Sequence, residues 1–541
     1  MGSFNRGFLK FLIIISLLPL VPAFLLALTL PGVLVVVVIA YFTWPAFRRG
    51  VDAVFGNLAR GLLRLAGGMF KGLFWIVTLP FRGLFLCAKW LSGVSVPRTR
   101  FMGWLERSWV LRSSNQGPLI DGLKSRLSEQ AGYESILVQG GMGRGKSSSF
   151  VLPNLLSSPS RKPSLVISDT SGELYQKSSG HLARQGYAIR VLNLMDPTRS
   201  ETYNPLANLS APQDIAELAG TLVRSANGRA TGGAAKDPFW DQAAEKLIRI
   251  MAQCLINRQD PGLMNLANLR HLIASFDAHA APKGQLGKID QFVLDSTKSD
   301  PTTFSAYRAF VNGNLKTIQS VLMSADVALD PIAIPELAAL TATHSIDFAE
   351  LRQRPTALYI MVNQTQMDHY AFLLNLFYAE LFKSLLQNEQ NPGNPVWLFL
   401  DEFGHLQISG FEVFATTARK YKICYALFLQ SLAQLEARYG RMHASTIIDG
   451  LGTEIYLPGT SLETARNLEA RLGRTAKAPL MAANDIIRMK DHQALMLHSN
   501  RLPILLRTKR YYQRRDLRWR ASRKPAPLPS HAAQNPRLIQ L

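Results

Sequence analysis

Residues 135–156 read SILVQGGMGRGKSSSFVLPNLL. The run ILV is typical of a buried strand, SSFVLPNLL can form a helix, and residues 140–147 fit the pattern G-x-x-x-x-G-K-[ST]. In that pattern glycines let backbone N–H groups turn around a phosphate, the lysine reaches the β- and γ-phosphates, and the serine hydroxyl binds Mg²⁺. The stretch predicts an α/β fold that binds ATP and Mg²⁺ through Gly140, Gly141, Met142, Gly143, Arg144, Gly145, Lys146, Ser147 and Ser148.

A second motif, VWLFLDE over residues 396–402, is an apolar run that ends in two acids. A buried strand with this ending places Asp401 where a P-loop enzyme needs a carboxylate for its metal, so Asp401 and Ser147 are the expected Mg²⁺ ligands. Glu402 is then expected to be the base that polarises the attacking water. Together with Lys146, these two acids form the predicted catalytic core.

Three further residues are candidates for the same site. Gln430 ends an apolar run and is expected to orient water or sense the γ-phosphate, or else to cap the next helix. Arg419 is expected either to reach the γ-phosphate of a neighbouring subunit in a ring-shaped ATPase or to belong to a solvated basic turn. Asp169 also follows an apolar run, where it lies near the nucleotide or caps the next helix.

Continuous apolar runs are typical of parallel strands that are buried on both faces. Seven runs are predicted to be such strands: residues 135–139, 164–168, 188–192, 357–361, 396–400, 423–429 and 454–457. Between about residues 205 and 346 this pattern gives way to helical patterns, as in residues 214–226, 241–256 and 314–329. The sequence therefore predicts a doubly wound α/β domain with an inserted all-α domain.

The amino-terminal region is strongly apolar, with no charged residue from Phe11 to Phe47. A single helix of that length would measure ~55 Å against a hydrocarbon core of ~30 Å, and TLPG at residues 29–32 offers a break. Two spans, roughly residues 9–29 and 32–47, are predicted, with both ends cytoplasmic because basic residues flank the run. A cleaved signal peptide is the alternative.

Two other segments are strongly basic. Residues 53–105 contain seven basic residues and no acidic residue, which predicts interfacial helices on an anionic leaflet, with a second transmembrane pair as the alternative. Residues 507–524 contain nine basic residues and one acid, interleaved with Tyr511, Tyr512 and Trp519. That mixture favours phosphate contacts and stacking on single-stranded nucleic acid, or a solubilising or membrane-leaning role.

The whole chain of 541 residues is 47% hydrophobic and 18% charged, which excludes a disordered or fibrous protein. Its 60 Lys and Arg against 38 Asp and Glu give a net charge of +22, which predicts a polyanionic partner such as nucleic acid or an anionic membrane. Three distant cysteines, Cys87, Cys254 and Cys424, exclude a disulfide scaffold and a zinc ribbon and favour a reducing compartment.

Several segments, in their order along the chain, resemble the type IV secretion coupling proteins, the VirD4/TraG/TraD group of membrane ATPases. The segments are the phosphate-loop stretch, SDTSGELY (168–175), MDPTRSETYNPL (195–206), DPFWDQAAEKLI (237–248), LFLDEFGHL (398–406), LQSLAQLEARYG (429–440) and the closing stretch 479–504. The chain departs from the family in two ways: residues 169–173 lack the Pro and Lys of the family's D-P-K-G-E segment, and the hairpin has almost no periplasmic loop.

The resemblance implies a RecA-like P-loop NTPase domain with an inserted all-α domain, preceded by a transmembrane helical hairpin. Six regions are expected: a transmembrane hairpin (1–50), basic membrane-proximal helices (51–105), the first part of the nucleotide-binding domain (106–206), the all-α insertion (207–345), the second part of the nucleotide-binding domain (346–506) and a basic C-terminal tail (507–541). Carried over by position, Lys146 and Ser147 would bind nucleotide and Mg²⁺, and Arg419 would be the arginine finger.

The same resemblance implies a multi-pass protein of the bacterial inner membrane, with its soluble domain in the cytoplasm. It would be a homo-oligomer, expected to be a hexamer, that associates with the inner-membrane complex of a secretion system and uses ATP hydrolysis to pass cargo to the channel. Relaxase-bound single-stranded DNA is the expected cargo. The alternatives are protein effectors and, more distantly, a double-stranded DNA translocase like FtsK.

Overall fold

The computed structural model describes residues 40–41, 43–45, 99–141, 143–157, 159–209, 211–229, 238–276, 286–475, 478–530 and 535–541. The chain divides into two compact units, Met1–Arg98 and Thr99–Leu541. The predicted hairpin and the basic membrane-proximal region lie outside the described residues, except for residues 40–41, 43–45 and 99–105. In the described part of the chain, no helix combines the length and the hydrophobicity that a membrane crossing requires.

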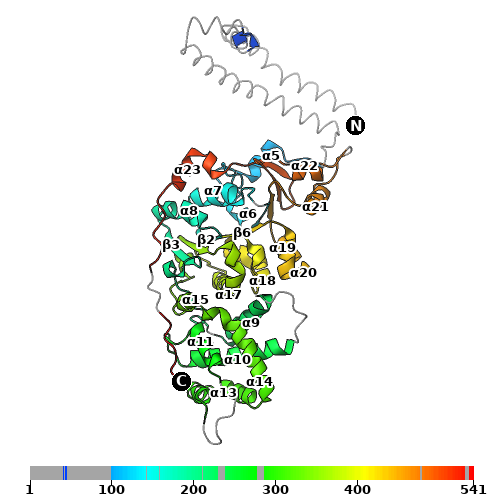
Figure 1. The fold of residues 1–541 in the computed structure, drawn as a ribbon. Coiled ribbons are helices and arrows are strands. Elements are labelled where there is room, and N and C mark those ends of the chain that lie inside the picture. The colour runs from blue at the N-terminus through cyan, green and yellow to red at the C-terminus, as the bar shows by residue number, and fades with distance from the viewer. Residues whose placement is uncertain are drawn as a thin grey trace. The chain divides into compact units, whose positions relative to one another are not determined.

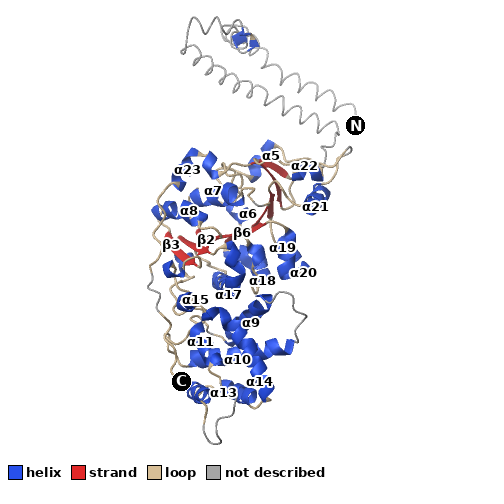
Figure 2. Cartoon of the chain, in the orientation of Figure 1, coloured by secondary structure: helices blue, strands red, loops and turns tan. Residues whose placement is uncertain are grey.

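A mixed sheet of nine strands forms the centre of the unit Thr99–Leu541 (Figures 1 and 2). Its strands lie in the order β3-β4-β2-β5-β6-β1-β7-β8-β9. The pairs from β3 to β7 in this order are parallel, whereas β8 and β9 are added antiparallel. The strands are β1 (Ile136–Gln139), β2 (Ser164–Asp169), β3 (Ala188–Asn193), β4 (Thr356–Met361), β5 (Val396–Leu400), β6 (Ile423–Leu429), β7 (Thr453–Tyr456), β8 (Gln493–His498) and β9 (Ile504–Arg507).

The seven predicted strands are confirmed, with small shifts at their ends, as β1 to β7. Strands β8 and β9 were not predicted. They come from the short runs QALMLH and ILLR, and β9 alternates buried and exposed residues. Two such runs separated by five residues are typical of an antiparallel pair, so the signal was present in the sequence.

Alternate residues of the central strands face opposite sides of the sheet. In β1, Ile136 and Val138 pack with Phe150 and Leu155 in one apolar cluster, whereas Leu137 belongs to the cluster on the other face.

The helices outside the insertion are α5 (Trp104–Val110), α6 (Glu129–Gly132), α7 (Leu152–Leu156), α8 (Glu173–Arg184), α17 (Met367–Leu385), α18 (Phe411–Thr417), α19 (Leu432–Tyr439), α20 (Arg441–Asp449), α21 (Leu462–Leu472), α22 (Ala483–Ile487) and α23 (Arg515–Ala521). These helices and the sheet are called the nucleotide-binding lobe below.

Between β3 and β4, the described residues form only helices and loops, and this region is called the helical insertion below. Its helices are α9 (Pro212–Arg229), α10 (Pro238–Asn257), α11 (Leu266–Ala274), α12 (Lys288–Ser296), α13 (Pro301–Val311), α14 (Leu315–Leu329), α15 (Pro335–Leu340) and α16 (Glu350–Gln353). The three predicted helical patterns are confirmed as α9, α10 and α14. Helix α9 contacts α17, so the insertion and one face of the sheet share a continuous apolar core.

Candidate nucleotide-binding site

The phosphate loop joins β1 to the following helix and depends on glycine. The φ angles of Gly143 and Gly145 are 68° and 95°, in the left-handed region that glycine occupies without strain. A Cβ on Gly140 would lie 2.7 Å from Cβ of Leu457, so a side chain there would displace the loop. Met142 lies outside the described residues. The loop is therefore held tightly against β7 while its backbone turns towards the site.

The helix after the loop begins at Lys146 with a π-helical turn, Lys146–Val151, and continues as α7. The backbone N–H of Ser149 donates to the Gly145 carbonyl at 2.7 Å, which closes that first turn. The Lys146 ammonium donates to the Gly140 carbonyl at 3.1 Å, so it lies across the loop. Ser147 is half-buried in the same turn. This arrangement presents an ammonium, a hydroxyl and helix N–H groups to one phosphate-sized region.

The two acids follow β5, and the sheet order places β6 between β5 and β1. The side chain of Gln430, just after β6, donates to the two carboxylate oxygens of Glu402 at 3.2 and 3.3 Å. Glu402 has a φ of 52°, a left-handed conformation that is uncommon for a residue with a side chain. The strained backbone and the amide together fix the direction of this carboxylate, as expected of a group that must meet a water molecule in one orientation.

Asp401 directly follows β5 and precedes Glu402. Burial and the Glu402 carboxylate raise the pKa of Asp401 to about 6, while the Lys146 ammonium acts in the opposite direction. A buried carboxylate beside an ammonium and close to a like charge needs a cation to stay ionised at little cost. The set of Lys146, Ser147, Asp401 and the glycine loop therefore fits a Mg²⁺–nucleotide, with Ser147 and Asp401 as the residues that would hold the metal.

Asp169 ends β2, the neighbour of β5 on the far side from β6. It is 1% exposed, and its carboxylate accepts hydrogen bonds from the backbone N–H groups of Tyr175 at 2.8 Å and Ser171 at 3.3 Å. Burial raises the pKa of Asp169 although these hydrogen bonds oppose the rise. Its carboxylate thus stabilises the first turn of α8, while its position on the shared sheet edge is close to Asp401, whose carbonyl accepts from the Ser168 hydroxyl at 3.2 Å.

Arg419 is not brought to this site within one chain. It precedes β6, so it lies at the amino end of that strand, whereas Gln430 follows the carboxyl end. Its guanidinium pairs with the Glu134 carboxylate at 3.2 Å, and its side chain is 55% exposed. The seven residues of β6 separate Arg419 from Gln430 by ~23 Å at 3.3 Å per residue. Within the chain, Arg419 therefore cannot touch a nucleotide bound by Lys146.

Sequence reasoning missed a charged cluster beside the phosphate loop. Asp491 pairs with Arg144 at 3.2 Å and with Arg510 at 4.0 Å. The Arg510 side chain lies 3.5 Å from the position of a Cβ on Gly145 and donates to the Tyr512 hydroxyl at 2.7 Å. The basic character of residues 507–524 was noted, but their return to the loop depends on β8 and β9, which were not predicted.

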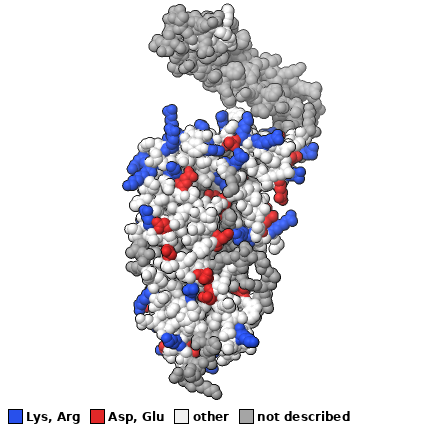
Figure 3. All heavy atoms as spheres, viewed as in Figure 1, with Lys and Arg blue, Asp and Glu red and all other residues white. Residues whose placement is uncertain are grey.

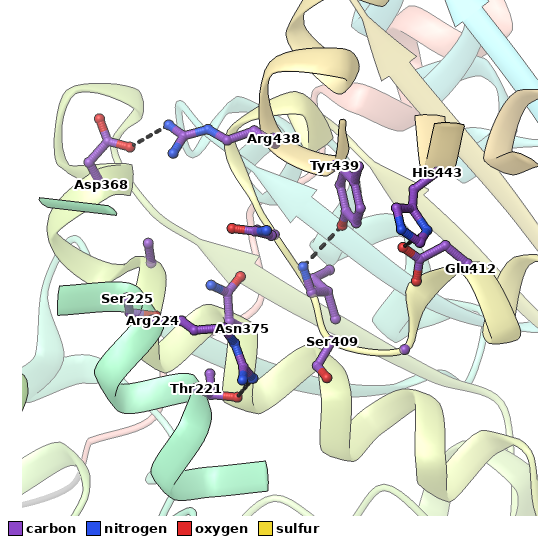
Figure 4. A pocket seen from close by; sticks show the side chains of 14 residues that line it. Thr221, Arg224, Ser225, Asp368, Asn375, Ser409, Glu412, Arg438, Tyr439 and His443 are labelled. Carbon is purple, nitrogen blue, oxygen red and sulfur yellow. Dashed lines mark hydrogen bonds and ion pairs between the residues drawn. The ribbon is translucent and has the colours of Figure 1, made fainter. Parts of the chain in front are cut away.

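A polar cavity of about 330 Å³ lies where the loop after Glu402 meets the helical insertion (Figure 4). The Arg438–Asp368 ion pair, at 3.1 Å, and the contact between Nδ1 of His443 and the Glu412 carboxylate, at 3.2 Å, border it. The hydroxyl of Tyr439 accepts a hydrogen bond from the backbone N–H of Ile408 at 3.0 Å. The cavity therefore lies between α9 of the insertion and the segment that follows the predicted catalytic acids.

The family model described as "Type IV secretory system Conjugative DNA transfer" matches residues 106–477. The chain belongs to this family. VirD4 of Rhizobium rhizogenes is 25% identical over 409 residues, which are 69% of this chain and 58% of that protein. The coupling protein TraD of Escherichia coli K12 is 23% identical over 345 residues, 63% of this chain and 44% of that protein. The chain thus spans less than two thirds of the length of these curated relatives.

Solved structures show the same fold as this member of the conjugative DNA transfer family. The plasmid coupling protein TrwB in complex with ADP and Mg²⁺ matches with a TM-score of 0.57 and 18% identity. The aligned region covers 76% of this chain and 93% of the TrwB chain. TrwB in complex with a non-hydrolysable ATP analogue matches with a TM-score of 0.58 and 17% identity, and the aligned region covers 82% of this chain and 99% of the TrwB chain. The likeness confirms the predicted α/β fold of the nucleotide-binding lobe.

Proposed function

We propose that the protein is the coupling ATPase of a type IV secretion system for conjugative DNA transfer. The observation that carries this proposal is that Lys146, Asp401, Glu402 and Gln430 belong to three neighbouring strands of one sheet and follow their carboxyl ends, in a chain of the conjugative DNA transfer family. TrwB, which has the same fold, has been solved with ADP and Mg²⁺, which supports the same ligands here.

The proposed mechanism assigns one task to each group. The loop N–H groups and Lys146 bind the β- and γ-phosphates, and Ser147 and Asp401 hold Mg²⁺, which neutralises charge on the phosphate oxygens when it is bound. Glu402 accepts the proton of the attacking water. Gln430 holds the Glu402 carboxylate in the direction that this proton transfer needs, through the hydrogen bonds at 3.2 and 3.3 Å.

We further propose that subunits assemble into a ring, with six copies as the expected number, so that Arg419 serves the nucleotide of its neighbour. The position of Arg419 supports this, because it is exposed and lies at the end of β6 opposite to Gln430. An arginine that approaches the γ-phosphate from the next subunit stabilises the charge of the transition state. Its pairing with Glu134 would then be exchanged for a phosphate when the ring closes.

The structural change that accompanies hydrolysis would be transmitted to the helical insertion through residues 403–410. Phe403, next to Glu402, packs at a centroid distance of 5.9 Å on the ring of Tyr439, whose hydroxyl holds Ile408. A shift of Glu402 on loss of the γ-phosphate would thus move the wall of the cavity that α9 lines. This gives the insertion, where we expect cargo to be recognised, a direct physical link to the nucleotide.

A location at the bacterial inner membrane is also proposed. The described unit begins at Thr99, and α5 exposes Trp104, Leu105 and Trp109, which are 60%, 51% and 74% exposed. Figure 3 shows Lys and Arg gathered over the end of the unit that carries α5 and α23. Exposed tryptophans among basic groups suit the interface of an anionic leaflet. The apolar run before residue 48 would supply the membrane anchor.

Relaxase-bound single-stranded DNA is the proposed cargo, and protein effectors are the alternative. Trp519 is 61% exposed, and the Arg523 guanidinium lies 3.8 Å from its ring centroid, a combination that can stack on a base and contact a phosphate. The same surface could serve the membrane, so the charge by itself does not choose between the two cargoes. A double-stranded DNA translocase is the more distant alternative.

The test is ATP turnover by the full chain in lipid nanodiscs, with and without single-stranded DNA, across a salt series. Stimulation by DNA that fades as salt rises is expected, because phosphate contacts release counterions. The Lys146→Ala variant provides the blank. An ATP turnover rate that does not change when DNA is added, in a protein shown to bind nucleotide, would favour protein effectors as the cargo. No turnover above the blank under any condition would overturn the proposed activity.

A further inference from the structure

The segment after α23 runs from the nucleotide-binding lobe to the helical insertion and contacts both (Figure 1). It follows a helix that is firmly packed: Leu517 is fully buried against the lobe, and the Arg520 guanidinium donates to the Leu156 carbonyl at 2.6 Å. Residues 522–530 and 535–541 are the described parts of this segment. It was predicted as a basic tail, but its backbone is bound at two separate places.

The first place is α8 of the nucleotide-binding lobe. A Cβ on Gly180 would lie 1.9 Å from the carbonyl oxygen of Lys524. The backbone at Lys524 therefore passes so close to α8 that only glycine fits at position 180. The Tyr175 hydroxyl donates to the Ala526 carbonyl at 2.7 Å, and the Ala526 N–H donates to the Ser179 hydroxyl at 3.1 Å. These contacts bind the main chain, and the Leu528 side chain adds packing against the apolar cluster on this face of the sheet.

The second place is α11 of the helical insertion, where Asn268 is fully buried. Its amide nitrogen donates to the Arg537 carbonyl at 2.8 Å, and its amide oxygen accepts from the Ile539 N–H at 2.9 Å. Nε2 of His271 lies 3.1 Å from the Ile539 carbonyl oxygen. One amide thus pairs with alternate residues of an extended backbone, as a neighbouring β-strand would do.

The side chains add selectivity at this second place. Ile539 is 8% exposed and lies in the apolar core of the insertion, whereas Leu538 points outwards and is 50% exposed. The Arg537 guanidinium lies 3.7 Å from the Asp260 carboxylate. The site on α11 therefore accepts an extended backbone with one buried aliphatic side chain and a basic residue two positions before it.

We propose that the described parts of this segment, residues 522–530 and 535–541, act as an intramolecular latch, and that residues 535–541 are the ligand of a peptide-binding site on α11 centred on Asn268. When that end is bound, it adds a second connection between the helical insertion and the nucleotide-binding lobe, beside the apolar core that α9 and α17 share. Docking of the latch requires no ATP hydrolysis and is therefore independent of the proposed function.

Docking of the latch is expected to be reversible. Three hydrogen bonds, the buried Ile539 side chain and the half-buried Leu541 side chain on the same core are opposed by the loss of backbone freedom over several residues, and these contributions are of similar size. A contact so balanced can open without unfolding either part of the protein. The first place lies at Tyr175, Ser179 and Gly180 of α8, so the latch connects the nucleotide-binding lobe to α11.

Docking is tested by hydrogen–deuterium exchange of the full chain, with a matched pair of neighbouring substitutions. Ile539→Asp places a charge in the core of the insertion, whereas Leu538→Asp makes the same change on an exposed side chain. Exchange of residues 537–541 should be at least ten-fold faster in Ile539→Asp and unchanged in Leu538→Asp. Exchange at the unprotected rate in the unmodified protein would overturn the proposal.

The restraint on the insertion is tested by the distance between spin labels at Met323→Cys on α14 and Gln176→Cys on α8, both exposed positions. Ile539→Asp should widen the distance distribution at least two-fold, and Leu538→Asp should leave it as it is. Equal distributions in all three proteins would overturn the latch.

A chain that ends at residue 530 is the control for misfolding of the Ile539→Asp variant. It should show the same widened distribution, and a synthetic peptide of residues 535–541 should narrow it again. The same peptide with the Ile539→Asp change should fail to do so. A shortened chain with the original distribution, or narrowing by both peptides alike, would contradict a specific site on α11.

Discussion

The two edges of the parallel sheet differ in what the same strands carry. At the carboxyl ends of β1, β5 and β6 lie Lys146, Asp401 and Gln430. At the amino ends of β1 and β6 lie Glu134 and Arg419, which form a half-exposed ion pair at 3.2 Å. In a parallel sheet, loops and helix amino termini with their N–H groups gather at the carboxyl edge, so phosphate chemistry belongs there. Arg419 at the amino edge pairs with Glu134 and lies too far from the phosphate loop to touch a nucleotide bound by its own chain.

The largest effect is expected from Lys146→Ala, which removes the charge that binds the phosphates. Turnover should fall by at least ~10³-fold, as for the loss of a group that stabilises transition-state charge. ATP hydrolysis by the full chain measures this, and Lys316→Ala, an exposed lysine of the helical insertion, is the matched control. Unchanged turnover would show that the carboxyl edge is not the site of hydrolysis.

Arg419→Ala tests whether the amino edge serves a neighbour. In the assembled protein, turnover should fall by roughly 10³-fold, the lower end of the effect of an arginine finger. Lys420→Ala, an exposed residue of the same turn, should have little effect. Mixing Arg419→Ala subunits with Lys146→Ala subunits should recover part of the activity, because each supplies what the other lacks. No recovery in mixed assemblies would place the role of Arg419 within its own chain.

Glu402→Gln separates binding from chemistry within the carboxyl edge. Loss of the base should lower turnover by about 10²–10³-fold. Affinity for a nucleotide, measured by fluorescence with a labelled analogue, should change little, because Lys146 and the loop remain. Glu436→Gln on α19 is exposed and serves as the control. A large loss of nucleotide affinity would mean that Glu402 binds rather than hydrolyses.

The smallest effect concerns α8, which begins at the carboxyl edge. Alanine in place of glycine inside a helix normally stabilises it by ~1 kcal/mol. At Gly180 the new Cβ would collide with the Lys524 carbonyl, so Gly180→Ala should instead destabilise the protein by about 1–3 kcal/mol. At Gly220 in α9 the nearest atom is the mobile end of Arg224, and Gly220→Ala should be stabilising. Thermal unfolding of both variants gives the sign.

Much of the fold followed from local pattern. Seven strands were predictable because a strand that is buried on both faces must be apolar throughout, and α9, α10 and α14 because their apolar stripes repeat with the helical period. Strands β8 and β9 were missed although their two runs are present in the sequence, and β9 has only four residues and one exposed face. The roles of Lys146, Ser147, Asp401 and Glu402 stay predictions, although the structure places all four as a nucleotide site requires.

The sequence by itself determined which residues are candidates for the site, because the phosphate loop and the acidic strand end are contiguous motifs. Only the tertiary structure decided which groups meet. It brought Gln430 to Glu402, placed Arg510 beside the phosphate loop and kept Arg419 at the opposite edge of the sheet. It also paired Asn268 with Ile539, 271 residues further along the chain. Such contacts depend on sheet order and packing, which no local periodicity records.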